Sequence, residues 1–164
     1  MLVLAWLLVF AGLYWFFSGW NERQFNPNID AAVVDGAELV LQRNRGGHYV
    51  APGIINGEAV TFLLDTGATQ VALPPSLAKK LSLRRGPNVQ IQTANGTVVG
   101  YQTRLASVQL GPIEVRNVSA LVTDGLGEDA VLLGMSFLKH VEFTQRGDRL
   151  ILRSLTGEST NQGG

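Results

Sequence analysis

The sequence predicts an all-β domain preceded by a membrane segment. From residue 48 onward, short β-prone runs are separated by turn residues. Two Asn-Gly pairs, at 56–57 and 95–96, each lie between two such runs, and Asn-Gly is a strong signal for a tight hairpin turn. The predicted organisation is a transmembrane helix (1–20), a linker or peripheral strand (21–47), the β-domain (48–155) and a flexible tail (156–164).

The amino-acid composition excludes several functions before any motif is considered. With 164 residues and 46% apolar side chains, the chain can build one folded core. The formal net charge is zero and no basic run resembles a phosphate-binding surface, so we expect no nucleic-acid partner. The absence of cysteine excludes disulfides, thiolate nucleophiles and cysteine-ligated metals. We expect neither a metal nor a cofactor.

The first twenty residues predict a single-pass membrane anchor. Residues 1–17 carry no charged side chain, and continuing through residue 20 gives about the length that crosses a bilayer core. Trp15 and Trp20 suit the membrane interface at its far end. A cleaved signal peptide is the alternative, but the segment lacks a basic start and a clear small-x-small cleavage site. The arginines that follow the span weakly favour a cytoplasmic domain.

The remaining expected elements are short strands and two short helices. The strands cover residues 38–41 (a possible edge strand), 49–55, 58–64, 71–73, 89–93, 97–101, 103–110, 113–115, 118–122, 130–134, 141–143 and 149–152. One helix opens at Pro74-Pro75 and runs to Leu81, and the other follows Gly134 and ends at His140. The hairpin at 89–101 has few large apolar residues, so it packs weakly and could project over a cleft; taken alone, the segment is equally typical of an ordinary exposed hairpin.

The tripeptide Asp65-Thr66-Gly67 is the most informative stretch, because it directly follows the apolar run 62–64. An ionised carboxylate there is costly unless water or hydrogen-bond donors reach it. Asp65 is therefore a candidate acid or base at a strand end, with Thr66 fixing the turn and Gly67 letting the backbone approach the carboxylate. The same three residue types also form ordinary turns, so the tripeptide alone leaves both interpretations open.

Other polar candidates have simpler explanations. His48 lies before the first strand of its hairpin and His140 in a short helix, so both are expected to be ordinary surface residues. The acidic, glycine-rich loop 124–129 lacks the alternating spacing of a calcium-binding loop, and we expect a solvated turn.

Three elements in order resemble the retropepsin-like aspartic proteases (clan AA), most closely the membrane-anchored members from bacteria. They are Leu63-Leu64-Asp65-Thr66-Gly67-Ala68, a hairpin with its tip at 93–97, and Leu132-Leu133-Gly134 before a short helix. The resemblance covers about residues 48–153. It departs from viral members at Thr69, where they usually carry an acidic residue, and at Met135, where they carry Arg or Asn.

The resemblance implies a closed β-barrel or sandwich with one or two short helices, and an aspartic endopeptidase that acts on a peptide or protein. This chemistry needs two carboxylates that share one proton, and no second Asp here follows the same pattern. The resemblance thus implies a homodimer with one Asp65 from each subunit. The catalytic residues would be Asp65, Thr66 and Gly67, and substrate would be bound by Ala68, Thr69, Thr93, Ala94, Asn95, Gly96, Leu133 and Gly134.

The resemblance also implies a location in the bacterial inner membrane. The protease domain would lie on the periplasmic side, against the weak charge signal, with the lipid bilayer contacted through residues 1–20. Two alternatives stay open: an inactive domain of the same fold that dimerises or binds an extended peptide by strand addition, and an unrelated membrane-anchored β-domain.

Overall fold

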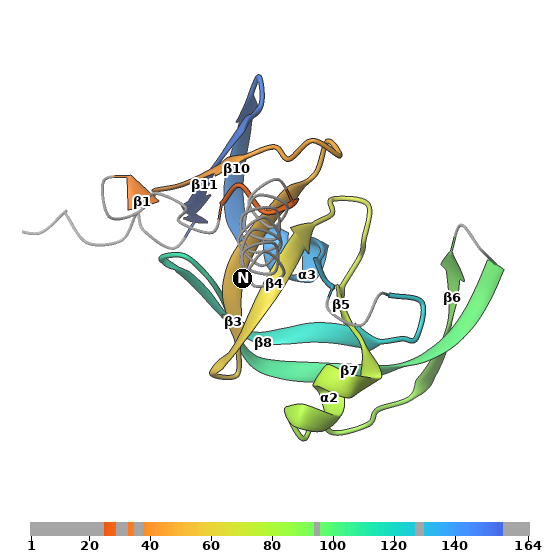
Figure 1. Cartoon of the computed structure of the whole chain (residues 1–164). Coiled ribbons are helices and arrows are strands. Elements are labelled where there is room, and N and C mark those ends of the chain that lie inside the picture. Colours follow the sequence, from red (N-terminus) through yellow and green to blue (C-terminus); the bar gives the residue numbers. More distant parts are fainter. Residues whose placement is uncertain (1–24, 29–32, 35–37, 94–95, 127–129, 156–164) are drawn as a thin grey trace, which may run out of the picture.

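The computed structural model of the chain is built mainly of β-strands (Figure 1), and it describes residues 25–28, 33–34, 38–93, 96–126 and 130–155. The described strands are β1 (Val33–Val34), β2 (Glu38–Gln42), β3 (Tyr49–Ile55), β4 (Glu58–Leu64), β5 (Val71–Leu73), β6 (Asn88–Thr93), β7 (Gly96–Leu110), β8 (Ile113–Val122), β9 (Val131–Leu133), β10 (Val141–Arg146) and β11 (Arg149–Ser154). The described helices are short, α2 (Pro75–Lys80) and α3 (Met135–Leu138). The predicted mostly-β class with short helices is confirmed.

The predicted membrane anchor (1–20) and tail (156–164) lie outside the described residues. Among the helices that the structure does describe, none is long and apolar enough to cross a membrane.

A closed barrel forms the centre of the domain. Its sheet has the strand order β3-β4-β9-β5-β8-β7-β6, and β3 also pairs with β7 through Ile54↔Gln109 and Ile55↔Val108. This last pairing joins the two ends of a six-strand run, so the sheet closes on itself, and β6 is left outside the ring. Figure 1 shows β6 and the adjoining part of β7 as a hairpin that projects away from the barrel.

Turn residues determine the register of the predicted hairpins. Asn56 and Gly57 adopt φ values of 49° and 86°, and Ile55 pairs with Glu58 across them. Both positive φ angles suit the two-residue turn that matches the twist of the flanking strands. The second predicted hairpin is confirmed as well, but its register differs: Thr93 pairs with Gly96, so Gly96 belongs to β7 and not to the turn.

Strands β7 and β8 run continuously where the sequence predicted two shorter strands each. Asn117 in β8 has a φ of 59°, yet the register is the same on both sides of it, with Leu105 paired to Val118 and Ser107 to Arg116. A bulge would add a residue to one strand and shift the register, so the left-handed Asn117 distorts the ladder only locally. The polar interruption near residue 117 therefore does not end the strand.

A second sheet, with the order β1-β2-β11-β10, packs beside the barrel. We expected residues 38–41 to form at most an edge strand, but β2 lies between β1 and β11. Leu39 and Leu41 are 2% and 0% exposed, so burial of their alternating side chains explains the interior position.

Residue Asn28 ties the preceding segment to one strand of each sheet, β2 and β3. Its side-chain amide donates to Val50 O at 2.7 Å and to Gln42 O at 2.9 Å, and its Oδ1 accepts from Gln42 N–H at 2.6 Å. These bonds satisfy backbone groups at the sheet margin that would otherwise be buried without a partner.

Candidate active site

The candidate catalytic carboxylate lies where two parallel strands end together. β4 pairs with β9 in parallel, and the last pair of the register is Leu64↔Leu133. Asp65 follows directly, and its N–H donates to Leu133 O at 3.2 Å, which extends the ladder by one bond. The apolar run therefore ends at the barrel margin, where the half-buried Asp65 leaves the sheet.

The loop after Asp65 folds back onto its carboxylate. Gly67 N–H donates to Asp65 Oδ1 at 2.8 Å, and Ala68 N–H donates to Asp65 O at 3.2 Å. A Cβ atom at Gly67 would lie 3.1 Å from Asp65 Oδ1, so a larger residue would crowd the carboxylate. Glycine thus lets the backbone approach and orient one carboxylate oxygen, leaving the other available.

The start of α3 supports this loop through backbone hydrogen bonds. Met135 N–H donates to Ala68 O at 2.8 Å, and Ser136 N–H donates to Thr69 O at 3.0 Å. The Ser136 hydroxyl in turn accepts from Val71 N–H at 3.0 Å. A Cβ at Gly134 would lie 2.6 Å from Ala68 O and even closer to Gln70 O, so only glycine allows this approach.

Asp65 opens onto a cavity of about 630 Å³. The floor comes from the loop 65–70 and the neighbouring strand ends, and one wall comes from β6 in the projecting hairpin. Asp65 is the only carboxylate among the described residues that line this cavity. A concave, mainly apolar site with one oriented carboxylate suits acid or base chemistry on a bound chain, but it contains only half of a carboxylate pair.

The predicted site residues that the structure describes occupy four different places. Asp65, Gly67, Ala68 and Thr69 line the cavity together. Thr66 is exposed at the loop surface and does not contribute to the lining.

The second predicted signature lies beneath the loop. Leu133 is fully buried and Gly134 is buried against the loop backbone, whereas their neighbour Leu132 reaches the cavity. At the hairpin tip, Ala94 and Asn95 lie outside the described residues. Thr93 and Gly96 are paired directly below the tip.

Several cavity residues were not anticipated from the sequence. They are Gln70, Ala72, Val89, Gln90, Ile91, Gln102, Leu121, Thr123, Gly125 and Leu126. Gly125 and Leu126 belong to the loop that we expected to be only a solvated turn. The alternation of polar and apolar residues along the β6–β7 hairpin could have suggested its residues in this set. Residues from other strands reach the cavity only through long-range strand pairing. Neither His48 nor His140 lines the cavity.

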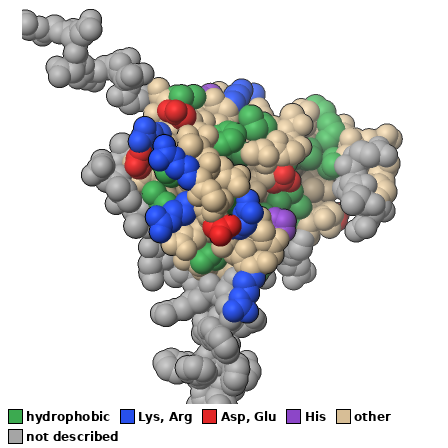
Figure 2. All heavy atoms as spheres, turned by 90° about the horizontal axis from the view of Figure 1, so that it is seen from above, with side chains coloured by type: hydrophobic (Ala, Val, Ile, Leu, Met, Phe, Trp, Pro, Cys, Tyr) green, Lys and Arg blue, Asp and Glu red, His purple; other side chains and the backbone are tan. Residues whose placement is uncertain are grey.

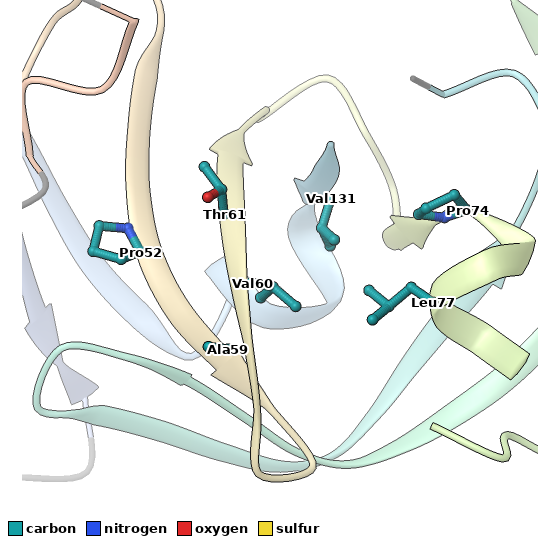
Figure 3. A pocket seen from close by; sticks show the side chains of 7 residues that line it. All are labelled: Pro52, Ala59, Val60, Thr61, Pro74, Leu77 and Val131. Atoms are coloured by element: carbon teal, nitrogen blue, oxygen red, sulfur yellow. The ribbon is translucent and has the colours of Figure 1, made fainter. Parts of the chain in front are cut away.

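Another cavity, of about 410 Å³, lies between β4 and α2 (Figure 3). Figure 3 shows Val60, Val131 and Leu77 around the gap between these elements. Its lining residues include no ionisable side chain, so it offers no acid or base. Among the described residues, no three His, Cys, Asp or Glu side chains lie close enough to hold a metal ion.

Comparison with known proteins relates this geometry to one family. Residues 51–140 match the family model described as "gag-polyprotein putative aspartyl protease". The chain is also similar to a retropepsin-like aspartic protease from Rickettsia conorii whose crystal structure is known. The two sequences are 34% identical, and the two structures superpose with a TM-score of 0.59. The similarity covers 70% of this chain and 97% of that protein, so almost the whole of the rickettsial domain is represented here.

Two curated relatives are named only as uncharacterized proteins. The one from Sinorhizobium sp, described as "in cobV 5'region", is 38% identical over 120 residues, which are 71% of this chain and 52% of that protein. The other, from Rickettsia prowazekii (strain Madrid E), is 34% identical over 120 residues, or 70% of this chain and 51% of that protein. The chain therefore spans about half the length of the curated relatives it matches.

Proposed function

Because the chain belongs to the retropepsin-like aspartic protease family, we propose that it is a membrane-anchored aspartic endopeptidase that is active as a homodimer. The observation that carries this proposal is Asp65, a carboxylate held by Gly67 N–H at 2.8 Å and facing a cavity that contains no other described carboxylate. Family membership implies a homodimer, and a second copy would supply the missing acid.

The proposed chemistry divides two roles between identical residues. Two carboxylates that lie close together do not both ionise easily, so they share a proton. The ionised Asp65 takes a proton from water as the water oxygen attacks the scissile carbonyl carbon, and the protonated Asp65 of the partner subunit gives its proton to the carbonyl oxygen. The tetrahedral intermediate then collapses: the C–N bond breaks as Asp65 gives the proton taken from water to the leaving nitrogen, and the partner subunit's Asp65 takes back a proton from a hydroxyl of the intermediate. We expect activity at acidic to neutral pH, because ionisation of both carboxylates removes the shared proton.

The exposed part of the loop gives the partner a place to dock. Thr66 and Gly67 are exposed next to the half-buried Asp65. We propose that Thr66 braces the two loops across the dimer axis, which would hold the carboxylates at a fixed separation. Substrate would lie in the cavity beneath the projecting hairpin.

A mixing experiment tests the shared site. Full-length wild type and Asp65→Asn chains are mixed in detergent, allowed to exchange subunits, and assayed on a diverse peptide library at constant total protein. If only wild-type homodimers are active, activity falls as the square of the wild-type fraction, to about one quarter at equal parts. A fall to about one half would mean that each subunit works alone and would contradict the proposal.

The matched control for mixing is Asp148→Asn. The Asp148 side chain is 87% exposed in the β10–β11 turn, 4.0 Å from Arg43, and an ion pair this exposed contributes little. Mixing wild type with this variant should leave activity unchanged.

Membrane anchoring is proposed from the apolar residues 1–20, and a bacterial inner-membrane location with a periplasmic domain from the family resemblance. Two anchored subunits would share one membrane, which raises their effective concentration and favours the dimer. We expect the chain to stay with membranes during carbonate extraction and to be digested by protease added to intact spheroplasts. Release into the carbonate supernatant, or protection in intact spheroplasts, would contradict the anchor or the orientation, respectively.

A further inference from the structure

A third cavity, here called the arginine pocket, lies directly beside the cavity of about 630 Å³ at Asp65, here called the catalytic cavity. It has a volume of about 280 Å³, and its charged lining residues are Arg84, Arg85 and Arg104. Gln70 and Gln102 line both cavities. An extended chain leaving the catalytic cavity past these two glutamines would therefore enter the arginine pocket.

Among the residues that the structure describes, the charged side chains at the arginine pocket are all positive. No acidic side chain is among its lining residues, and none of its three arginines forms an ion pair within the part of the chain that the structure describes. The whole chain is neutral, and acidic and basic side chains are intermixed on the face shown in Figure 2. A cluster of one sign is thus a property of this pocket and not of the protein as a whole.

The backbone around the pocket is fixed. Gly86 N–H donates to Gln102 O at 2.8 Å, and Gln102 N–H donates to Pro87 O at 2.9 Å. The Thr103 hydroxyl donates to Arg84 O at 2.7 Å. A Cβ at Gly86 would lie 2.6 Å from Gln102 O, so the segment before β6 needs glycine to lie this close to β7.

Two of the guanidinium groups are positioned by neutral partners. Arg85 lies over the Tyr101 ring at 4.4 Å and donates to Asn88 Oδ1 at 3.1 Å. Arg104 donates to Asn117 Oδ1 at 2.9 Å. A guanidinium has five N–H donors, so these contacts orient each group, leave its charge intact and leave donors for a carboxylate.

A buried acceptor marks the border between the two cavities. The side-chain oxygen of Gln70 is buried and has no hydrogen-bond partner among the described residues. Burying an acceptor without a hydrogen bond costs folding free energy unless a ligand or a water molecule donates to it.

We propose that the arginine pocket is a specificity subsite that binds an acidic side chain of the peptide substrate, at a position displaced from the scissile bond. The inference rests on the proposed endopeptidase function. The carboxylate of Asp or Glu would accept hydrogen bonds from the guanidinium groups while the main chain passes Gln70. In a two-fold dimer the pocket occurs at both ends of the cleft, so acidic residues on either side of the cleaved bond are favoured.

The test compares peptides that differ in one charge. Starting from a cleaved library peptide, each position on either side of the scissile bond is made Glu or Gln in turn, and kcat/KM is measured for the full-length protein. We expect at least one displaced position at which Glu is preferred over Gln by about five- to ten-fold, and a smaller preference as salt is raised. The Arg85→Gln/Arg104→Gln chain should bring this ratio close to one.

The matched control is Arg116→Gln. Arg116 is an exposed arginine of β8 that lines neither cavity and pairs with Glu114 at 3.0 Å. Its Glu-over-Gln ratio should equal that of wild type. Melting temperatures of all variants identify any that fail to fold, and in that case Arg104→Gln alone replaces the double variant.

A binding measurement separates failure of the subsite from failure of the protease. Rhodamine-labelled Glu and Gln peptides are titrated with the full-length Asp65→Asn chain and followed by fluorescence anisotropy. Tighter binding of the Glu peptide, lost in the arginine variant, supports the subsite even if no peptide is cleaved. Equal affinity for the two peptides overturns the subsite, whether or not the wild type cleaves.

Discussion

The Asp65→Asn chain is expected to cleave peptides at least about a thousand-fold more slowly than wild type. In a homodimer one substitution removes both carboxylates, and with them the base that activates water and the acid that polarises the carbonyl. The amide of Asn is nearly isosteric, and its oxygen can still accept from Gly67 N–H, which lies 2.8 Å from Oδ1 in the wild type. The loop should therefore persist while the chemistry is lost.

The measurement is mass-spectrometric detection of cleavage in a diverse peptide library, from acidic to neutral pH, using the full-length chain in detergent. The free energy of unfolding should change by less than about 1 kcal/mol, so loss of activity is not loss of fold. Asp148→Asn, at an exposed turn, should keep wild-type activity. Equal cleavage by wild type and Asp65→Asn, or no cleavage by wild type at any pH tested, would contradict the enzyme assignment.

Local signals in the sequence predicted the hairpins well. The Asn56-Gly57 turn needs two positive φ angles, which this pair of residues adopts easily, and the register of β3 and β4 follows from it. The position of Asp65 at the end of β4 then follows from strand length alone. The loop at Asp65 was predictable because its chemistry and its backbone requirements are contained in three consecutive residues.

Long-range pairing was not predictable from such signals. Nothing near β4 indicates that it pairs in parallel with β9, some seventy residues later, or that β3 closes the barrel onto β7. The interior position of β2 depends in the same way on a partner, β11, near the other end of the domain. Periodicity shows which side chains are buried, but not which strand covers them.

The walls of the cavity at Asp65 and of the arginine pocket were missed for the same reason. Gln70 lies five residues from Asp65, but Gln102 and Arg104 come from β7 and reach the site only because β7 pairs with β8 in the barrel. The sequence showed Arg84-Arg85 as a short basic turn. Only the structure joins that turn to Arg104 and makes a local positive site in a neutral chain.

Apart from substitutions of Asp65, Gly134→Ala should be the most damaging change. The added methyl group would meet the carbonyl oxygens of Ala68 and Gln70, at 2.6 Å for Ala68, and backbone oxygens cannot rotate away as a side chain can. Relief requires the loop and α3 to separate, which would break the bonds from Met135 N–H to Ala68 O and from Ser136 N–H to Thr69 O. We expect a loss of about 3 kcal/mol or more, seen as a fall in melting temperature on the order of 10 °C.

The matched control for this clash is Gly147→Ala, which separates steric crowding from backbone strain. Gly147 has a φ of 60° in the β10–β11 turn, and a Cβ there would meet nothing within 4 Å, so only the left-handed backbone costs energy, about 1 kcal/mol. Equal destabilisation by the two substitutions would contradict the close approach of α3 to the Asp65 loop. If that approach is correct, Gly134→Ala should also lower peptide cleavage at temperatures where the barrel is still folded, because the loop that orients Asp65 loses its support before the core does.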